Sequence, residues 1–142
     1  MATYDPKQVT VSFGNLILGD FGPDTFINIT RDGDDFEAKQ GAAGATEWVN
    51  KNSNIHNIEF TLLQTSPIND SLSAALEADR SGNGGAKSFQ VKDAGGTTVV
   101  SFGEARIVKP ANVEYSASSN ARTWTLKATK ASSFNIGGIP AV

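Results

Sequence analysis

The 142-residue sequence predicts a mainly β fold, a β-sandwich or barrel with one flanking α-helix, built as a single domain over residues 1–142. Apolar and polar residues alternate along many short segments, which is the pattern of half-buried strands. Only one segment, at about residues 67–81, has helical spacing instead. Gly, Ser, Thr and Asn are plentiful and charged residues make up only 19% of the chain, a balance that suits strands joined by turns.

In the N-terminal half, strands are expected at "QVTVSF" and "TFINIT". Asp32-Gly33 lies between "TFINIT" and the next alternating run, "DDFEAKQ", and this placement predicts a β-hairpin. On the returning strand Phe36 lies on one face, whereas Asp35 and Glu37 lie on the other. The glycines and alanines of "GAAGA" interrupt the pattern before a further strand at "TEWVNK".

The segment "IHNIEFTLLQ" alternates most cleanly, with Ile58, Phe60 and Leu62 predicted to face inward. Further strands are expected at "KSFQVKD", "TTVVSF", "EARIVKP" and "ARTWTLKATK". In the last of these, Trp124, Leu126 and Ala128 share the inward face.

The helical segment is "SPINDSLSAALEADRSG". Ser66 is its expected N-cap, Pro67 its first residue, and Gly82 follows its end. Its apolar stripe comprises Ile68, Leu72, Ala75 and Leu76 and ends at Asp79, so one face should pack on a sheet.

Composition and charge exclude several classes of function. The net charge is −3 and no basic block occurs, which disfavours tight binding of DNA or RNA. The absence of Cys excludes disulfides and thiolate metal sites. Neither a membrane span nor a signal peptide is recognisable, so we expect a protein made in a cytoplasm with no membrane partner.

The carboxylates between Asp32 and Glu37 are the first candidate site. A calcium loop would need a Glu at its twelfth position, where this chain has Ala43. Asp35 and Glu37 lie about 7 Å apart by the strand rise, a separation compatible with a catalytic carboxylate pair, but acids on the same face of a ribbon more often form a solvated face. A looser cation site in the turn stays open as an alternative.

No other residue pattern predicts catalysis. His56, the single histidine, has none of the neighbours of a catalytic triad and is expected to be structural or exposed. The run "SGNGGAKS" lacks the spacing and the strand-to-helix context of a phosphate-binding loop. Trp48 and Trp124 are expected to be core or interface aromatics more than ligand platforms. We therefore predict no enzyme, no metal and no cofactor.

Four segments in order resemble tail tube proteins of contractile-tailed bacteriophages: "TYDPKQVTVSFG", "RDGDDFE", "TLLQTSPINDSLSAALEAD" and "KDAGGTTVVSFGEARIVKP". The resemblance covers nearly the whole chain. It implies a virion protein of the tail, assembled in the host cytoplasm, whose hexameric rings stack into a hollow tube for genome ejection. The implied partners are other copies of the chain, a tail sheath protein, a tape-measure protein, baseplate and tail terminator proteins, and DNA that passes without specific binding.

Two sets of residues are then predicted to act in assembly. The polar side of three strands should line the channel, because short polar groups and carboxylates do not hold phosphates; this set is Asn28, Thr30, Asp35, Glu37, Asn57, Glu59 and Thr61. A flexible loop at residues 41–54 should contact an adjacent subunit, and its expected contact residues are Gly41, Gly44, Trp48 and Asn50. The N-terminal arm at residues 1–7 and the tail "IGGIPAV" are expected to be ordered by neighbouring subunits.

Three alternatives stay open. Within virion proteins the chain fits a capsid decoration protein or a tail-completion ring protein. Within the same fold it fits the tube of a contractile bacteriocin, through which no DNA passes. A different class is a carbohydrate-binding β-sandwich module that uses Trp48 or Trp124 with nearby acids.

Overall fold

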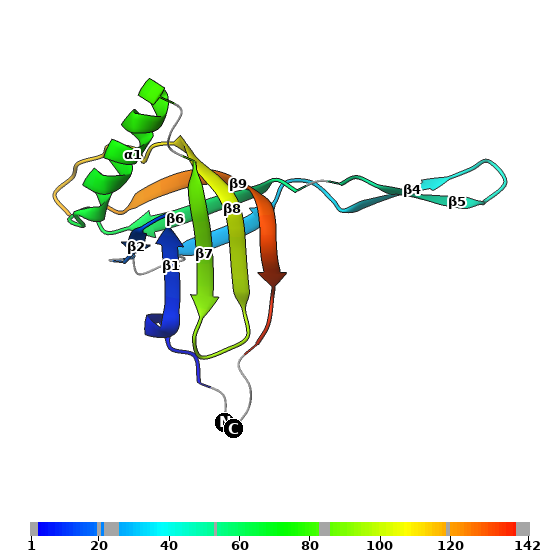
Figure 1. Cartoon of the computed structure of the whole chain (residues 1–142), viewed down its shortest axis with the longest axis horizontal. Coiled ribbons are helices and arrows are strands. Elements are labelled where there is room, and N and C mark those ends of the chain that lie inside the picture. Colours follow the sequence, from blue (N-terminus) through cyan, green and yellow to red (C-terminus); the bar gives the residue numbers. More distant parts are fainter. Residues whose placement is uncertain are drawn as a thin grey trace.

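Figure 1 shows the computed structural model of the chain, which describes residues 3–19, 21, 26–52, 54–82, 86–118 and 120–138. It consists of a body, formed by a seven-stranded sheet and one helix, and a two-stranded arm that projects from the body (Figure 1). The elements in chain order are the 3₁₀ helix η1 (Pro6–Gln8), β1 (Val9–Phe13), β2 (Leu16–Leu18), β3 (Ile27–Arg31), β4 (Phe36–Gln40), β5 (Thr46–Asn50), β6 (His56–Leu62), α1 (Ile68–Gly82), β7 (Lys87–Asp93), β8 (Val99–Lys109) and β9 (Arg122–Asn135). The prediction of a mainly β fold with one helix is confirmed.

The body sheet has the strand order β2-β1-β7-β8-β9-β6-β3, and every neighbouring pair is antiparallel. The sheet curls around its own core. Phe60 on β6 and Phe89 on β7 are separated by two strands in the sheet, yet their ring centroids lie 6.5 Å apart. Flat strands at these positions would be about 14 Å apart, given the usual spacing of 4.7–4.9 Å between neighbours.

The core follows the predicted alternation. Ile58, Phe60 and Leu62 on β6 have no exposed surface, and Leu126 and Ala128 on β9 are equally buried. Burial of large apolar side chains is the main stabilising contribution in a domain of this size, which explains why one curled sheet is sufficient. The inward faces predicted for β6 and β9 are therefore correct.

Helix α1 closes one end of the curled sheet (Figure 1). The hydroxyl of Ser66 accepts a hydrogen bond from the Ile68 N–H at 3.2 Å, which is the expected N-cap. Leu72 is fully buried, and Asp79 forms an ion pair of 3.1 Å with Arg106 on β8. Trp124 in the core donates its indole N–H to the Asn69 side chain at 3.0 Å, so the helix is joined to the sheet by polar contacts as well as packing.

Three strand predictions need correction. The runs "TTVVSF" and "EARIVKP" are one strand, β8, which continues through Gly103 with irregular pairing to β9 on both sides of it. Strand β9 extends to Asn135, beyond the predicted run, and bends where Lys130 has a φ of 56°. The three-residue strand β2 was not predicted, because it is too short to show alternation.

The hairpin predicted at Asp32-Gly33 is wrong. Strand β3 pairs with β6, and β4 pairs only with β5. The hairpin is therefore β4–β5, and its turn is at Gly41–Ala45, where Gly44 has a φ of 92° and the Gly41 N–H donates to the Ala45 carbonyl at 2.7 Å. The predicted loop at residues 41–54 thus contains the turn and the whole of β5.

Candidate functional site

The outer face of β3, β6 and β9 is polar and nearly neutral. Direct cross-strand partners share a face, and Asn28 lies opposite Glu59 and Thr30 opposite Asn57. Thr61 faces Thr123, and their hydroxyl oxygens are 3.0 Å apart. Strand β9 adds further polar groups to the same face through the pairs Glu59–Thr125 and Asn57–Lys127. We call these eight residues the polar sheet face: Asn28, Thr30, Asn57, Glu59, Thr61, Thr123, Thr125 and Lys127.

Asp35 and Glu37 were predicted to line the channel together with five residues of this face. The structure does not place them on it. Asp35 lies at the base of the arm and forms an ion pair of 2.6 Å with Arg31. Glu37 lies on β4 in the separate two-stranded sheet. The grouping was wrong because β4 was assumed to pair with β3, and the opposite face of β4 does not reach the core: Phe36 is 59% exposed.

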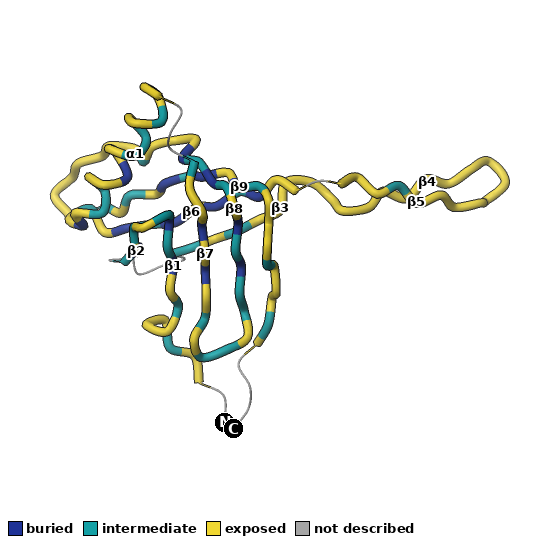
Figure 2. The backbone as a smooth tube through the Cα atoms, in the orientation of Figure 1, coloured by how far each residue is buried: buried dark blue, intermediate teal, exposed yellow. Residues whose placement is uncertain are grey.

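The arm has two chemically different faces, and both are uncovered. Cross-strand partners share a face, and Phe36 pairs with Asn50 and Ala38 with Trp48. One face is therefore uncharged and carries Phe36, Ala38, Gln40, Thr46, Trp48 and Asn50. The other carries the charged residues Glu37, Lys39 and Glu47 together with Val49. Trp48 is 70% exposed, and Figure 2 shows exposed residues along nearly the whole arm. The predicted contact residues Gly41, Gly44, Trp48 and Asn50 all lie on this arm.

The arm joins the body through a short polar junction. The Asp32 N–H donates to the Ile55 carbonyl and the Lys51 N–H donates to the Asp35 carbonyl, both at 2.9 Å. The Arg31–Asp35 ion pair spans the same place. Beyond this junction β4 and β5 pair only with each other, because they form a separate two-stranded sheet.

His56 lies at the junction but inside the body. Its side chain is 2% exposed, and its ring centroid is 4.9 Å from that of Phe102 and 5.0 Å from that of Phe134. Burial lowers the pKa of His56, and the nearby positive charge of Arg31 lowers it further, whereas a backbone hydrogen bond at Asn54 and the carboxylate of Asp35 act in the opposite direction. Of the two roles expected for this histidine, the structural one is observed.

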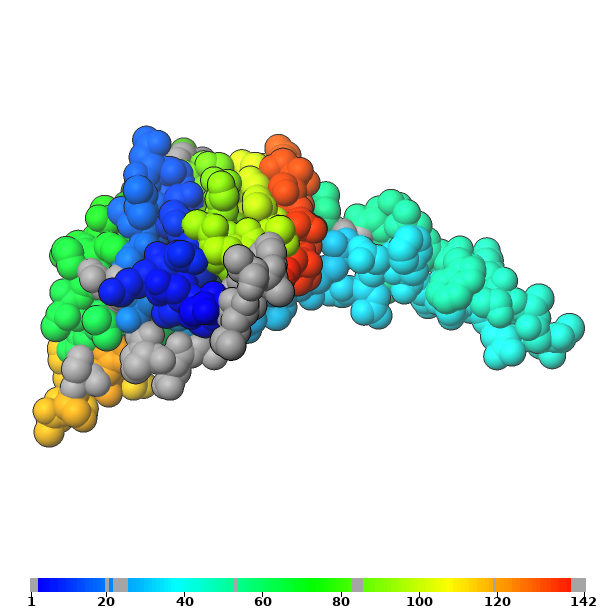
Figure 3. Space-filling view, turned by 90° about the horizontal axis from the view of Figure 1, so that it is seen from below, coloured from blue at the N-terminus to red at the C-terminus, as the bar shows by residue number. Residues whose placement is uncertain are grey.

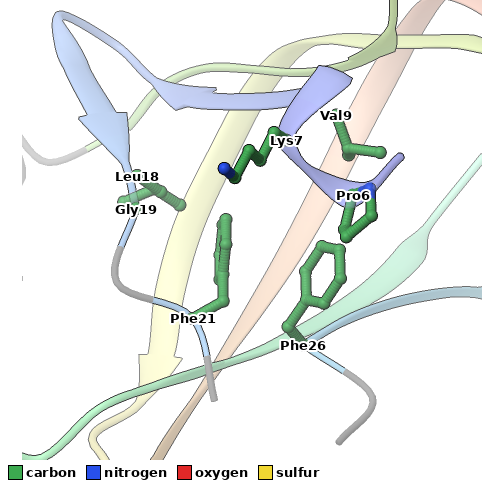
Figure 4. Close-up of a pocket in the computed structure, with 7 residues that line it drawn as sticks. All are labelled: Pro6, Lys7, Val9, Leu18, Gly19, Phe21 and Phe26. Atoms are coloured by element: carbon green, nitrogen blue, oxygen red, sulfur yellow. The ribbon is translucent and has the colours of Figure 1, made fainter. Parts of the chain in front are cut away.

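An apolar pocket of about 550 Å³ opens beside η1 (Figure 4). The rings of Phe21 and Phe26 form one side of it, with centroids 4.8 Å apart. The Lys7 side chain points across the pocket toward Leu18 and Phe21 (Figure 4). The described lining residues are Pro6, Lys7, Val9, Leu18, Gly19, Phe21 and Phe26. This pocket could not be predicted from the sequence, because no pattern indicates that η1 lies beside Leu18, Phe21 and Phe26.

Over their described parts, the two ends of the chain make hydrogen bonds within the chain. The Asp5 carboxylate accepts from the Lys7 N–H at 3.0 Å and caps η1. Near the other end, the Gly138 carbonyl accepts from the Thr97 N–H at 3.0 Å, and the Gly137 N–H donates to the Thr98 hydroxyl. Residues 1–2 and 139–142 of the predicted flexible ends lie outside the described residues.

The described part of the chain contains no helix with the length and apolar character needed to cross a membrane. It also contains no group of three or more His, Cys, Asp or Glu residues placed to hold a metal ion.

No protein-family model matches the sequence, and no curated protein is significantly similar to it. Among solved structures, the tube-terminating cap of the anti-feeding prophage matches 99% of this chain and 93% of that chain with a TM-score of 0.64 at 12% identity. A chain of the sheath-tube complex of the PVC extracellular contractile injection system in its extended state matches 97% of this chain and 93% of that chain, with a TM-score of 0.61 at 15% identity.

A third match comes from the virion of a native gene transfer agent. It covers 98% of this chain and 100% of that chain, with a TM-score of 0.58 at 12% identity. All three similarities extend over nearly the complete length of both chains. The fold of this protein is therefore tail-tube-like from end to end.

Proposed function

We propose that this chain is a structural protein of a phage-type tail, and specifically a subunit of its inner tube. The observation that carries the proposal is the arm: a two-stranded ribbon with exposed Trp48 and Phe36, which no described part of its own chain covers. An isolated two-stranded ribbon is marginally stable in water, so such an arm is best explained by a partner that covers it. The fold shared with a chain of a sheath-tube complex supports the same conclusion.

The edges of the body sheet support assembly of copies into rings. Among the described strands, β2 pairs only with β1 and β3 only with β6, so each leaves one edge unpaired. Exposed edges invite pairing with other chains unless they are covered. Pairing of β2 in one copy with β3 in the next would close a ring, and six copies per ring follows from the resemblance to tail tube proteins. Stacking of rings is a head-to-tail contact that does not close and gives a filament.

In such a tube we assign the polar sheet face to the channel. It carries one acid, Glu59, and one cation, Lys127, among hydroxyl and amide groups. The amine of Lys127 lies 3.8 Å from the Asp32 carboxylate, which reduces its availability to phosphate. A face of this kind lets DNA pass without the counterion release that produces binding. The proposed role is structural and not enzymatic, and its proposed partners are a sheath protein and a tape-measure protein.

A second candidate is a cap that terminates the tube, because the cap of the anti-feeding prophage shares the fold over 99% of this chain. A cap forms one ring and stops there, whereas a tube subunit adds ring upon ring. The two roles therefore differ in the length of the assembly and not in the fold of the subunit.

Negative-stain electron microscopy of the purified chain at rising concentration, with light scattering in parallel, tests the proposal. Hollow tubes whose length grows with concentration support the tube subunit, and single rings at all concentrations support the cap. A chain that stays monomeric up to its solubility limit, also when co-expressed with a tail initiator complex, contradicts both.

A further inference from the structure

We propose that the apolar pocket beside Lys7 receives Trp48 from the arm of a second copy of this chain. This inference rests on the proposed assembly function and names the contact that would order the arm. It concerns two surfaces of the same chain, the uncharged arm face and the pocket, which have complementary chemistry.

The arm carries a large aromatic side chain that is exposed to solvent. Trp48 is 70% exposed, and its cross-strand partner Ala38 is too small to shield it. Phe36 lies two residues before Ala38 on the same face and is 59% exposed. Large aromatic side chains at the centre of an uncharged face are the usual anchors of protein interfaces, where they enter a pocket on the partner.

The pocket supplies the matching surface. A volume of about 550 Å³ accommodates one large aromatic side chain together with its neighbours. The Phe21 and Phe26 rings are tilted by 32° to each other and offer both edges and faces to an indole. The ammonium group of Lys7 points across the opening, where it can lie over the face of the indole ring (Figure 4).

Charge favours the uncharged face of the arm, and not its charged face, as the occupant of the pocket. The described lining of the pocket is apolar except for Lys7 and contains no carboxylate. Insertion of the opposite face would bring Glu37, Lys39 and Glu47 against phenylalanine rings and remove their charges from water. The indole instead brings no charge, and its face attracts the single cation of the pocket.

The donor of Trp48 must be another copy. The arm extends away from the body and from the N-terminal segment in two perpendicular views (Figures 1 and 3). The strand β5 that carries Trp48 makes no sheet contact with the body. Each copy thus donates one arm and offers one pocket, and a contact between two different surfaces continues from copy to copy as a ring or a filament requires.

Cysteine cross-linking in the assembled full chain tests the contact directly, because the natural chain has no Cys. Ala38→Cys marks the arm opposite Trp48, and Gly19→Cys marks the pocket, where an added Cβ meets no atom within 4 Å. We expect a short bismaleimide to convert the assembled double variant into a ladder of covalent oligomers, with no ladder for either single variant. The control pairs Ala38→Cys with Ser73→Cys on the exposed face of α1 and should give no ladder.

A second variant measures the contribution of the indole. Trp48→Ala should raise the concentration needed for assembly about 30-fold or more, as removal of an interface hot spot does, while the far-ultraviolet circular dichroism of the monomer stays unchanged. Failure of the wild-type chain to assemble would contradict the proposed function itself. Wild-type assembly with no ladder from the Ala38→Cys, Gly19→Cys variant, or with unchanged assembly of Trp48→Ala, would overturn only the pocket contact.

Discussion

The body and the arm are built from strands of similar sequence pattern but differ in what covers them. Strand β6 alternates between buried and accessible residues, and the side chains of Ile58, Phe60 and Leu62 have no exposed surface. Strand β4 also alternates apolar and polar residues, yet all five of its residues are exposed (Figure 2). An alternating pattern therefore shows that a strand has two different faces. It does not show that the apolar face is covered by the same chain.

The difference has an energetic counterpart. Each large side chain in the body core contributes roughly 1.5–3 kcal/mol through burial. The arm buries almost nothing, so its order depends on its own hydrogen bonds and on whatever covers it. The body is expected to fold alone, whereas under the proposed function the arm is expected to gain most of its stability on assembly.

Two phenylalanines give the strongest test of this contrast. Phe60→Ala should lower the free energy of unfolding by about 3–5 kcal/mol, because it leaves a cavity beside Phe89 in the core. Phe36→Ala in the arm should change it by less than about 0.5 kcal/mol. Urea denaturation of the monomer, followed by circular dichroism, measures both values. Equal losses in the two variants would mean that the arm is part of the body core.

The helix cap should show an intermediate effect. Ser66→Ala removes the hydroxyl that accepts from the Ile68 N–H and should cost about 1 kcal/mol. Ser73→Ala is the matched control, because Ser73 is exposed and its hydroxyl donates within the helix to the Asn69 carbonyl. A thermal melt that shifts equally for both variants would contradict a specific role of the cap.

The smallest effect should come from the junction between the two regions and depend on pH. The pKa of His56 is below its ordinary value of 6.5 in the folded chain, so on acidification the unfolded chain takes up the proton first. Stability is then complete above about pH 6.5 and decreases as the pH falls below it. His56→Phe keeps an aromatic ring between Phe102 and Phe134 and should remove this dependence between about pH 6.5 and 5, above the range in which carboxylates titrate.

Because His56 is the only histidine, no other side chain of that type contributes to the comparison. Unfolding free energies of both proteins at several pH values give the two slopes. Parallel slopes would show that the imidazole is solvated in the folded state.

The parts of the fold that could be predicted from the sequence are those that the residues of one segment determine by themselves. Ser66, Pro67 and an apolar stripe around Leu72 located the helix to within one residue. Alternation identified the buried residues of β6 and of the first half of β9 correctly. In both regions the inward-facing residues pack in the core, where the main requirement on a side chain is that it be hydrophobic.

The parts that could not be predicted depend on which strands meet. Asp32-Gly33 has good local turn chemistry, but β3 gains more by pairing with β6, where Ile27 and Ile29 lie opposite Phe60 and Ile58. That choice sends β4 out of the body and separates Asp35 and Glu37 from the polar sheet face. The pocket was missed for the same reason, since Lys7 and Phe21 meet only through the tertiary fold.

The position of the arm has a consequence for variation of this protein. Arg31 and His56 are direct partners in the β3–β6 pair, so the chain leaves the body and returns to it at adjacent points. Removal of everything between them would leave two strands that a short turn can join. The arm is thus an insertion into a hairpin, and inserts at such sites can change in length or sequence at low cost to the rest of the domain. If the arm makes the proposed contact, exchanging the insert between relatives would exchange the neighbour that each copy accepts, while the same body is kept.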